Sequence, residues 1–203
     1  MPDEQLIIFV KAPRAGFVKT RLAMTVGADT ALEAYLALVE VIRSNLAAIP
    51  GVDFHFTPDD GRDEITPWLQ NDWTTSPQSD GDLGEKLDHA FKRAFDDGAK
   101  KVVIIGSDCP YVDADDIREA FDQLGAHDAV LGPAKDGGYW LVGLNAASPE
   151  LFRGINWSTE TVLEETMQKA DVAGLSVASL RELSDVDNVA DLMRFHEWNS
   201  FRP

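Results

Sequence analysis

Four basic side chains lie close together near the start of an otherwise acidic chain. They are Lys11, Arg14, Lys19 and Arg21. They follow the apolar segment 6–10, which is typical of a buried strand, and open α/β sheets bind ligands where such strands end. This loop, with the backbone N–H groups of Ala12 and Gly16, therefore predicts binding of a diphosphate or triphosphate. The alternative is a solvated loop with surface ion pairs, each worth about 0 to 1 kcal/mol.

Two aspartates are candidates for binding a divalent metal ion. Asp108 directly follows the apolar segment 102–105, so its carboxylate should project from the carboxyl edge of the sheet. Asp187 belongs to Asp185-Val186-Asp187, just before a helix that we expect to be capped by Asn188. Hard oxygen ligands of this kind suit Mg²⁺ or Mn²⁺ that also contacts phosphate. The alternative is that the acidic residues near residue 187 only cap the helix and interact favourably with the positive end of its dipole.

A turn at residues 135–138 carries the third feature. Its Asp136-Gly137-Gly138 sequence predicts a tight turn with positive φ angles at glycine. It also offers a carboxylate, which could accept a proton from an attacking hydroxyl or bind a sugar, and Tyr139 or Trp140 could stack on that sugar. Asp136 and Lys19 are thus the two candidates for catalysis, Lys19 by offsetting phosphate charge.

Two further segments have both a structural and a functional interpretation. Gly81, Asp82 and Gly84 could form only a helix start that Asp82 caps, or their glycines could let a nucleobase or ribose lie against the backbone. Ser158 or Thr159 most simply caps a helix, with Trp157 in the core. The functional alternative is that Trp157, Ser158, Thr159 and the turn residues Gly137, Gly138 and Tyr139 bind an acceptor.

Short apolar runs alternate with amphipathic stretches, which predicts an α/β fold with a mostly parallel sheet. We expect strands at 6–10, 52–57, 102–105, 128–132, 139–144 and 175–180. We expect helices at 29–48, at 83–95, after a two-aspartate capping box at 113 and 116, after 158–159, and from 188.

Composition excludes several classes of function. The 203 residues carry a net charge of −17, which disfavours nucleic-acid and anionic-membrane partners. Apolar runs are too short to span a bilayer, and Cys109 is the only cysteine, which fits a reducing, cytoplasmic location. We expect one domain covering 1–203. The sequence is compatible with a homodimer.

Six motifs together resemble a family of small bacterial GT-A-like proteins, formerly a domain of unknown function, known as nucleotide-diphospho-sugar transferases or as glycosyltransferases associated with arsenosugar or selenium gene clusters. The motifs are 9–13 with 19–22, 81–84, 106–110, 131–139, 157–159 and 185–187. Some also resemble motifs of 2-phospholactate guanylyltransferases, molybdenum-cofactor nucleotidylyltransferases and sugar-acid cytidylyltransferases. The resemblance implies a GT-A-like, Rossmann-type three-layer α/β/α fold, and metal roles for Asp108 and Asp187.

The residues and the resemblance together predict a metal-dependent transferase that uses a nucleotide-activated donor and a small-molecule acceptor. The first hypothesis is a sugar-nucleotide-dependent glycosyltransferase. The second is a nucleotidylyltransferase that transfers a nucleoside monophosphate from a triphosphate to a phosphorylated substrate and releases pyrophosphate. The third is a nucleotide-binding protein without catalytic activity, because a fold alone does not establish an activity.

Overall fold

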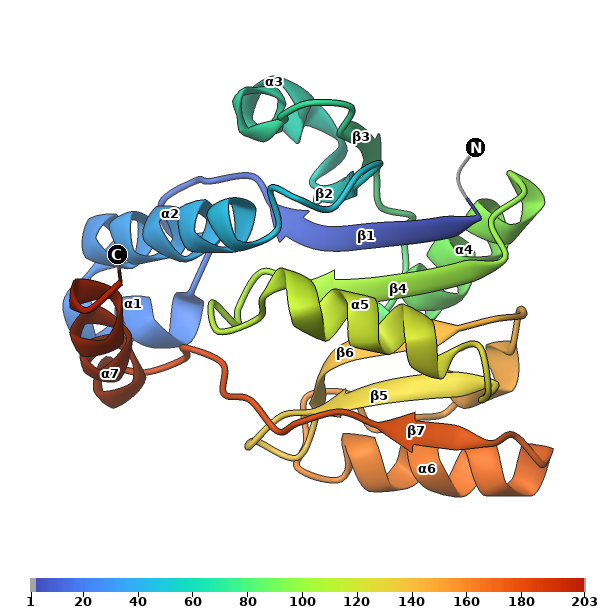
Figure 1. The fold of residues 1–203 in the computed structure, drawn as a ribbon. Coiled ribbons are helices and arrows are strands. Elements are labelled where there is room, and N and C mark those ends of the chain that lie inside the picture. Colours follow the sequence, from blue (N-terminus) through green and yellow to red (C-terminus); the bar gives the residue numbers. More distant parts are fainter. Residues whose placement is uncertain (1–2, 203) are drawn as a thin grey trace.

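One seven-stranded sheet forms the centre of the molecule (Figure 1). The structure, a computed structural model, describes residues 3–202. In chain order the strands are β1 Glu4–Lys11, β2 Asp53–Thr57, β3 Thr74–Pro77, β4 Lys101–Gly106, β5 Ala129–Pro133, β6 Tyr139–Leu144 and β7 Val177–Ser179. Their order across the sheet is β3-β2-β1-β4-β6-β5-β7, and only β6 runs antiparallel to its neighbours. The predicted mostly parallel sheet is therefore confirmed.

Helices cover both faces of this sheet. They are α1 Thr20–Val26, α2 Ala28–Asn45, α3 Arg62–Ile65, α4 Leu83–Asp96, α5 Ala114–Gln123, α6 Val162–Ala173 and α7 Val189–Ser200. Three short 3-10 helices lie at Asp59–Gly61, Thr66–Trp68 and Pro149–Leu151. Helices α2 and α5 share one apolar cluster with the sheet, and α4 and α6 share another on the opposite face. This gives the predicted three-layer α/β/α arrangement.

Alternation along the central strands explains the two clusters. Ile7 in β1 and Ile104 in β4 face α4, whereas Ile8 and Ile105 face α2 and α5. Because both faces are covered, the central strands are apolar on both sides and read as continuous hydrophobic runs. The charged and polar residues of the site must therefore follow the strands, where the chain leaves the sheet.

A third apolar cluster joins α1, α2 and α7, which are far apart in the sequence. Leu22 of α1, Leu38 of α2 and Phe195 of α7 are buried together with Val186. Helix α7 begins at the predicted cap, where the side chain of Asn188 accepts a hydrogen bond from the backbone N–H of Asp191. The cluster therefore fixes the loop before α1 and the segment before α7 beside each other.

Most predicted elements are confirmed, including the capping box in which Asp113 and Asp116 bond to each other's backbone N–H. Helices α1 and α3 and strand β3 were not predicted, because each has seven residues or fewer. The prediction that Ser158 or Thr159 caps α6 was wrong. The N-cap of α6 is Thr161, whose side chain makes no capping hydrogen bond, and Ser158 lies at a positive φ of 66°.

A buried polar cluster joins β2 to β3. Oδ2 of Asp53 accepts a hydrogen bond from Oγ of Ser76 at 3.0 Å and lies 3.0 Å from Nε2 of His55. Burial alone would raise the pKa of Asp53, but these hydrogen bonds outweigh burial and lower it.

Among residues 3–202, no helix combines the length and hydrophobicity that a membrane crossing requires.

Candidate active site

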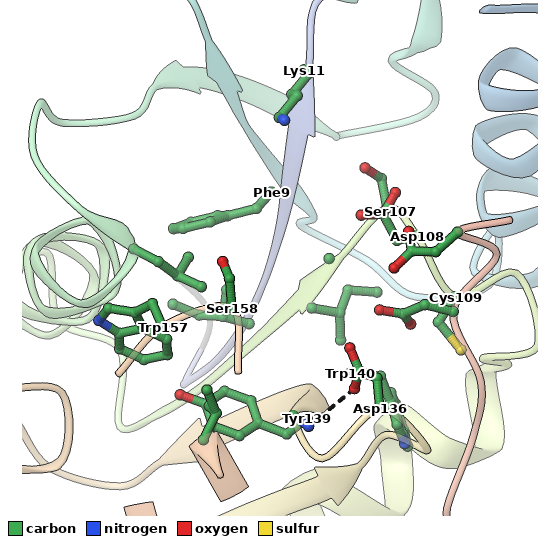
Figure 2. Close-up of a pocket in the computed structure, with 18 of the residues that line it drawn as sticks. Phe9, Lys11, Ser107, Asp108, Cys109, Asp136, Tyr139, Trp140, Trp157 and Ser158 are labelled. Atoms are coloured by element: carbon green, nitrogen blue, oxygen red, sulfur yellow. Dashed lines mark hydrogen bonds between the residues drawn. The ribbon is translucent and has the colours of Figure 1, made fainter. Parts of the chain in front are cut away.

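A cavity of about 710 Å³ opens at the carboxyl ends of β1 and β4. Its walls include the end of β1 and the loop into α1, the start of α4, the end of β4, the β5–β6 turn, and the segments before α6 and α7. Figure 2 shows side chains from several of these segments pointing toward a common space. The position agrees with the general rule that open α/β sheets bind ligands beyond the carboxyl ends of their strands.

Asp108 and Asp187, which are far apart in the sequence, meet on one side of this cavity. The backbone N–H of Val186 donates a hydrogen bond to the carbonyl oxygen of Asp108 at 3.0 Å, and the Val186 side chain is fully buried. This bond ties the segment before α7 to the end of β4. Both carboxylates stay partly exposed, so a ligand can reach them.

Lys19 places its ammonium group between these carboxylates. Nζ lies 2.5 Å from Oδ1 of Asp108 and 3.6 Å from Oδ1 of Asp187, and only 3% of the side chain is exposed. The angles satisfy no hydrogen bond between Nζ and any residue that the structure describes. The attraction between this cation and the two carboxylates therefore holds Lys19 in place at the cavity wall.

The backbone at Lys19 is left-handed, with φ 46° and ψ 46°, immediately before α1. This conformation costs a residue with a side chain about 1–2 kcal/mol, and the surrounding packing must offset it. Two residues later, Nη1 of Arg21 lies 3.6 Å from Oδ2 of Asp187. Lys19 and Arg21 thus approach the same carboxylate from one loop.

Asp185 adds a third carboxyl group beside the pair. Burial, followed by the negative charge of Asp108, raises its pKa to about 7. The sequence indicated this segment but assigned the metal role only to Asp187. The raised pKa therefore reflects first the burial of this carboxyl group and second its closeness to Asp108.

The donor set at this wall fits a divalent ion that is shared with phosphate. Asp108 and Asp187 supply hard oxygen donors, and the Lys19 ammonium shows that a cation is stabilised between them. Within residues 3–202, no three or more His, Cys, Asp or Glu side chains gather in a way that could hold a metal ion. Mg²⁺ typically binds through one or two carboxylates plus substrate phosphates, so two protein carboxylates are enough only when a phosphate completes the shell.

Asp136 faces the cavity from the turn between β5 and β6 (Figure 2). Its Oδ1 accepts a hydrogen bond from the backbone N–H of Gly138 at 3.0 Å. Gly137 has a φ of +87°, and a Cβ there would lie 2.6 Å from the carbonyl carbon of Glu160. The N–H of Leu163 donates to the carbonyl oxygen of Gly137 at 2.9 Å. The turn is therefore seated tightly against the start of α6, and this contact fixes Asp136.

Aromatic and aliphatic side chains form the opposite half of the cavity. Tyr139 and Trp157 pack edge to face at 6.4 Å, and Phe9 and Leu83 complete this half. Trp140 also lines the cavity, but it is buried and its Nε1 donates to the carbonyl oxygen of Arg181, so little of its surface is open to a ligand. The sequence prediction missed Phe9 and Leu83, because apolar residues in a strand or helix give no sign of facing a cavity.

Several predicted binding residues do not line the cavity. Arg14 pairs with Glu64 at 2.6 Å and with Asp60 at 3.0 Å, so its charge is already matched. Ala12 is buried, and neither Gly16 nor Gly137 contributes to the cavity wall.

The glycine-containing segment before α4 also stays outside the cavity wall. Asp82 caps α4 through a capping box with Glu85, as predicted by the structural interpretation. A Cβ at Gly81 would collide with the Glu85 side chain, and a Cβ at Gly84 would lie 2.5 Å from the carbonyl oxygen of Phe152. Local packing therefore accounts for both glycines.

Tyr35 was not predicted, yet its hydroxyl supports the floor of the site. The hydroxyl accepts a hydrogen bond from the N–H of Lys11 at 2.9 Å and donates to the carbonyl oxygen of Lys11 at 3.0 Å. It also lies 3.3 Å from Oγ of Ser107. Tyr35 thus links the end of β1 to the end of β4 from beneath.

Comparisons with solved structures agree with this geometry. A protein from Desulfovibrio desulfuricans G20, provisionally described as a nucleotide-diphospho-sugar transferase, has 35% sequence identity and a TM-score of 0.92, with 99% of this chain and 89% of that chain covered. A CMP:2-keto-3-deoxy-manno-octonic acid synthetase in complex with CTP has a TM-score of 0.62 at 8% identity, covering 97% and 98% of the two chains. Glucosyl-3-phosphoglycerate synthase from Mycobacterium tuberculosis, in complex with Mn²⁺, UDP and glucosyl-3-phosphoglycerate, has a TM-score of 0.53 at 12% identity, covering 90% and 70%.

The two distant structures establish the GT-A-like fold alone, whereas the Desulfovibrio protein is a relative in sequence as well. No curated protein matches the chain. The model of the family described as "Uncharacterized protein conserved in bacteria (DUF2064)" matches residues 44–159, which is more than half of the chain. With the full-length similarity to the Desulfovibrio protein, this confirms the resemblance predicted from the motifs, and the chain belongs to the DUF2064 family.

Proposed function

We propose that the protein is a metal-dependent transferase that uses a nucleotide-activated donor, and that it is a sugar-nucleotide-dependent glycosyltransferase of small-molecule metabolism. The observation that carries this proposal is the convergence of Asp108 and Asp187 with Lys19 at one wall of the cavity. Paired carboxylates and a buried cation suit a pyrophosphate group that is bound through a divalent ion. The name of the Desulfovibrio relative supports the choice of a sugar nucleotide as donor.

Lys19 and Arg21 stabilise the charge that develops on the departing nucleoside diphosphate. Both cations already lie near Asp187, so they need little rearrangement to reach a phosphate that is bound beside it. Lys11 adds a third cation from the end of β1. A divalent ion held by Asp108 and Asp187 would neutralise the phosphate oxygens as a Lewis acid.

Asp136 orients the acceptor hydroxyl and accepts its proton. Oδ1 is engaged by the N–H of Gly138, which leaves Oδ2 available to the acceptor. The acceptor oxygen then bonds to the sugar carbon as the bond from that carbon to the diphosphate breaks. The aromatic half of the cavity, which includes Tyr139 and Trp157, holds the acceptor next to this carboxylate.

Nucleotidyl transfer is the second candidate. The three cations Lys11, Lys19 and Arg21, which all line the cavity, would suit a triphosphate, and the synthetase of similar fold was solved with CTP. In that reaction an oxygen of a substrate phosphate attacks the α-phosphorus and pyrophosphate leaves, so no base is required to deprotonate a hydroxyl.

One experiment separates the candidates. The protein is incubated with Mg²⁺, nucleoside triphosphates and sugar phosphates, and separately with sugar nucleotides and alcohol acceptors. We expect release of a nucleoside diphosphate in the second set only. Pyrophosphate release confined to the first set would instead establish nucleotidyl transfer, and calorimetric nucleotide binding with no turnover in either set would support a protein without catalytic activity.

The variant Asp136→Asn adds a second criterion. Loss of a general base typically lowers kcat by about 10²- to 10⁴-fold, which is the effect expected for glycosyl transfer. Asp171→Asn, which changes an exposed carboxylate in α6, is the matched control. A small effect of Asp136→Asn on kcat would remove Asp136 from the mechanism and favour nucleotidyl transfer.

A further inference from the structure

The floor of the cavity contains one position without a side chain. His55, Phe9 and Gly106 are register partners on β2, β1 and β4, so they form a row across three neighbouring strands. His55 is buried and stacks on Phe9 at 5.8 Å with an interplanar angle of 15°. Phe9 is half-buried and lines the cavity (Figure 2). The row therefore ends at Gly106, next to the exposed part of the Phe9 ring.

Gly106 leaves open space where its side chain would stand. A Cβ built at this position meets no atom within 4 Å, and the φ of Gly106 is not in the left-handed region. Strand alternation places position 106 on the same face as Ile104, which also lines the cavity. Neither backbone conformation nor packing within the protein therefore requires glycine here, so the space over Gly106 belongs to the cavity itself.

Aromatic and aliphatic side chains surround this space, together with the polar groups of Lys11, Lys86 and Ser158, which also line the cavity. Tyr139 and Trp157 lie on the same face of the sheet as Phe9, and Leu83 reaches the cavity from the first residue of α4 with 44% of its surface exposed. An exposed leucine and a half-buried phenylalanine beside a bare backbone favour a flat ligand with an apolar face. Adjacent strands lie about 4.8 Å apart, so a ring above Gly106 would contact the Phe9 ring at ordinary van der Waals distance.

We propose that this subsite, formed by Phe9, Leu83, Gly106, Tyr139 and Trp157, binds a ring of the acceptor, and that the missing side chain at residue 106 sets the size of the ring that is admitted. The inference rests on the proposed function, because it assigns the other half of the cavity to the nucleotide. That half carries Lys19, Arg21, Asp108 and Asp187, whereas Lys11, two residues after Phe9, and Lys86 of α4 line the cavity on the Phe9 face. The acceptor is thus a cyclic small molecule with an apolar face, such as a pyranose or a phenyl ring.

The test fills the space without disturbing the protein. Gly106→Ala and Gly106→Val introduce side chains of increasing size into open space, so both variants should fold. Ala48→Val, at an exposed position after α2, is the matched control for the change in bulk. Thermal unfolding verifies that the three variants are as stable as the original protein.

Two binding measurements then follow on each protein. Calorimetry in the presence of Mn²⁺ gives the Kd of UDP, GDP and CTP. Saturation-transfer NMR with the nucleotide bound compares cyclic probes, namely phenyl β-D-glucopyranoside and myo-inositol, with the acyclic probes glycerol and D-lactate. We expect saturation transfer to the cyclic probes only, at least tenfold weaker binding of them to Gly106→Val, an intermediate loss for Gly106→Ala, and nucleotide Kd values within twofold of the original protein.

Three outcomes overturn the proposal. If the cyclic probes fail to bind the original protein, or bind no better than the acyclic probes, the subsite does not select a ring. If Gly106→Val weakens nucleotide binding at least tenfold instead, the ring above Gly106 belongs to the nucleoside. If Ala48→Val has the same effect as Gly106→Val, the loss is not local. Failure of the proposed function is distinguishable, because it appears in the turnover experiment, where sugar nucleotides and acceptors would release no nucleoside diphosphate, whereas failure of this subsite proposal appears in the binding of the cyclic probes.

Discussion

Replacing Gly137 by alanine tests whether the β5–β6 turn is seated as described and so positions Asp136. The alanine at position 137 would have to adopt a φ of +87°, which costs a residue with a side chain about 1–2 kcal/mol. Its Cβ would also lie 2.6 Å from the carbonyl carbon of Glu160, closer than any ordinary contact. Overpacking of this kind typically costs about 1–3 kcal/mol. Gly137→Ala should therefore lower the free energy of unfolding by about 2–5 kcal/mol.

Gly174→Ala separates the two contributions. Gly174 ends α6 at a φ of +71°, and a Cβ there meets nothing within 4 Å. This variant carries only the conformational cost of about 1–2 kcal/mol. Urea unfolding of both variants gives the difference directly. If Gly137→Ala is destabilised no more than Gly174→Ala, the turn is not held against Glu160, and the placement of Asp136 in the cavity loses its support.

Three other predictions concern side chains that support or charge the site. Lys19→Met removes the cation between Asp108 and Asp187. In the absence of nucleotide, this variant should bind Mn²⁺ at least tenfold more tightly than the original protein binds it, as measured by electron paramagnetic resonance. Unchanged Mn²⁺ binding would show that Lys19 does not compete for these carboxylates. Tyr35→Phe leaves the N–H of Lys11 without its partner and should lower the free energy of unfolding by about 1–3 kcal/mol in urea, and an effect near zero would contradict the described role of the hydroxyl. The pKa of Asp53 is lowered in the folded protein, so its ionised form stabilises the fold above the ordinary carboxyl pKa of about 4, and this contribution is lost as the pH falls below that value. The difference in stability between the original protein and Asp53→Asn should therefore shrink between pH 7 and pH 3, and a constant difference would argue against the lowered pKa.

The sequence predicts the parts of the site whose chemistry is unusual for their position. Asp108 is recognisable because it directly follows a buried strand, at the edge where open α/β sheets bind ligands. Asp187 is recognisable only together with Asp108, because an acidic residue before a helix is common as a cap. Lys19 and Arg21 are recognisable as neighbouring cations in an acidic chain. These residues do meet in the structure, because the Val186 hydrogen bond and the cluster around α7 bring the end of the chain to the end of β4.

Other features depend on contacts that no local pattern contains. Arg14 has the same charge as Lys19 and lies near it in the sequence, yet Arg14 forms an ion pair with Glu64. Glu64 lies on a short helix that was not predicted. Phe9 looks like any core residue of β1, and only the missing side chain at Gly106 and the end of the helix layer leave it facing a cavity. Tyr35 is buried in α2, but burial alone does not reveal which carbonyl its hydroxyl reaches.

The route of the chain after β7 has a consequence for how the protein matures during synthesis. All seven strands are complete at Ser179, whereas Asp185 and Asp187 follow them and depend on Val186 and α7 for their position. A nascent or proteolytically shortened chain that stops before residue 185 would contain every strand of the sheet and still lack one side of the ligand-binding wall. A small molecule that binds through this wall would therefore stabilise the fold only after α7 has docked.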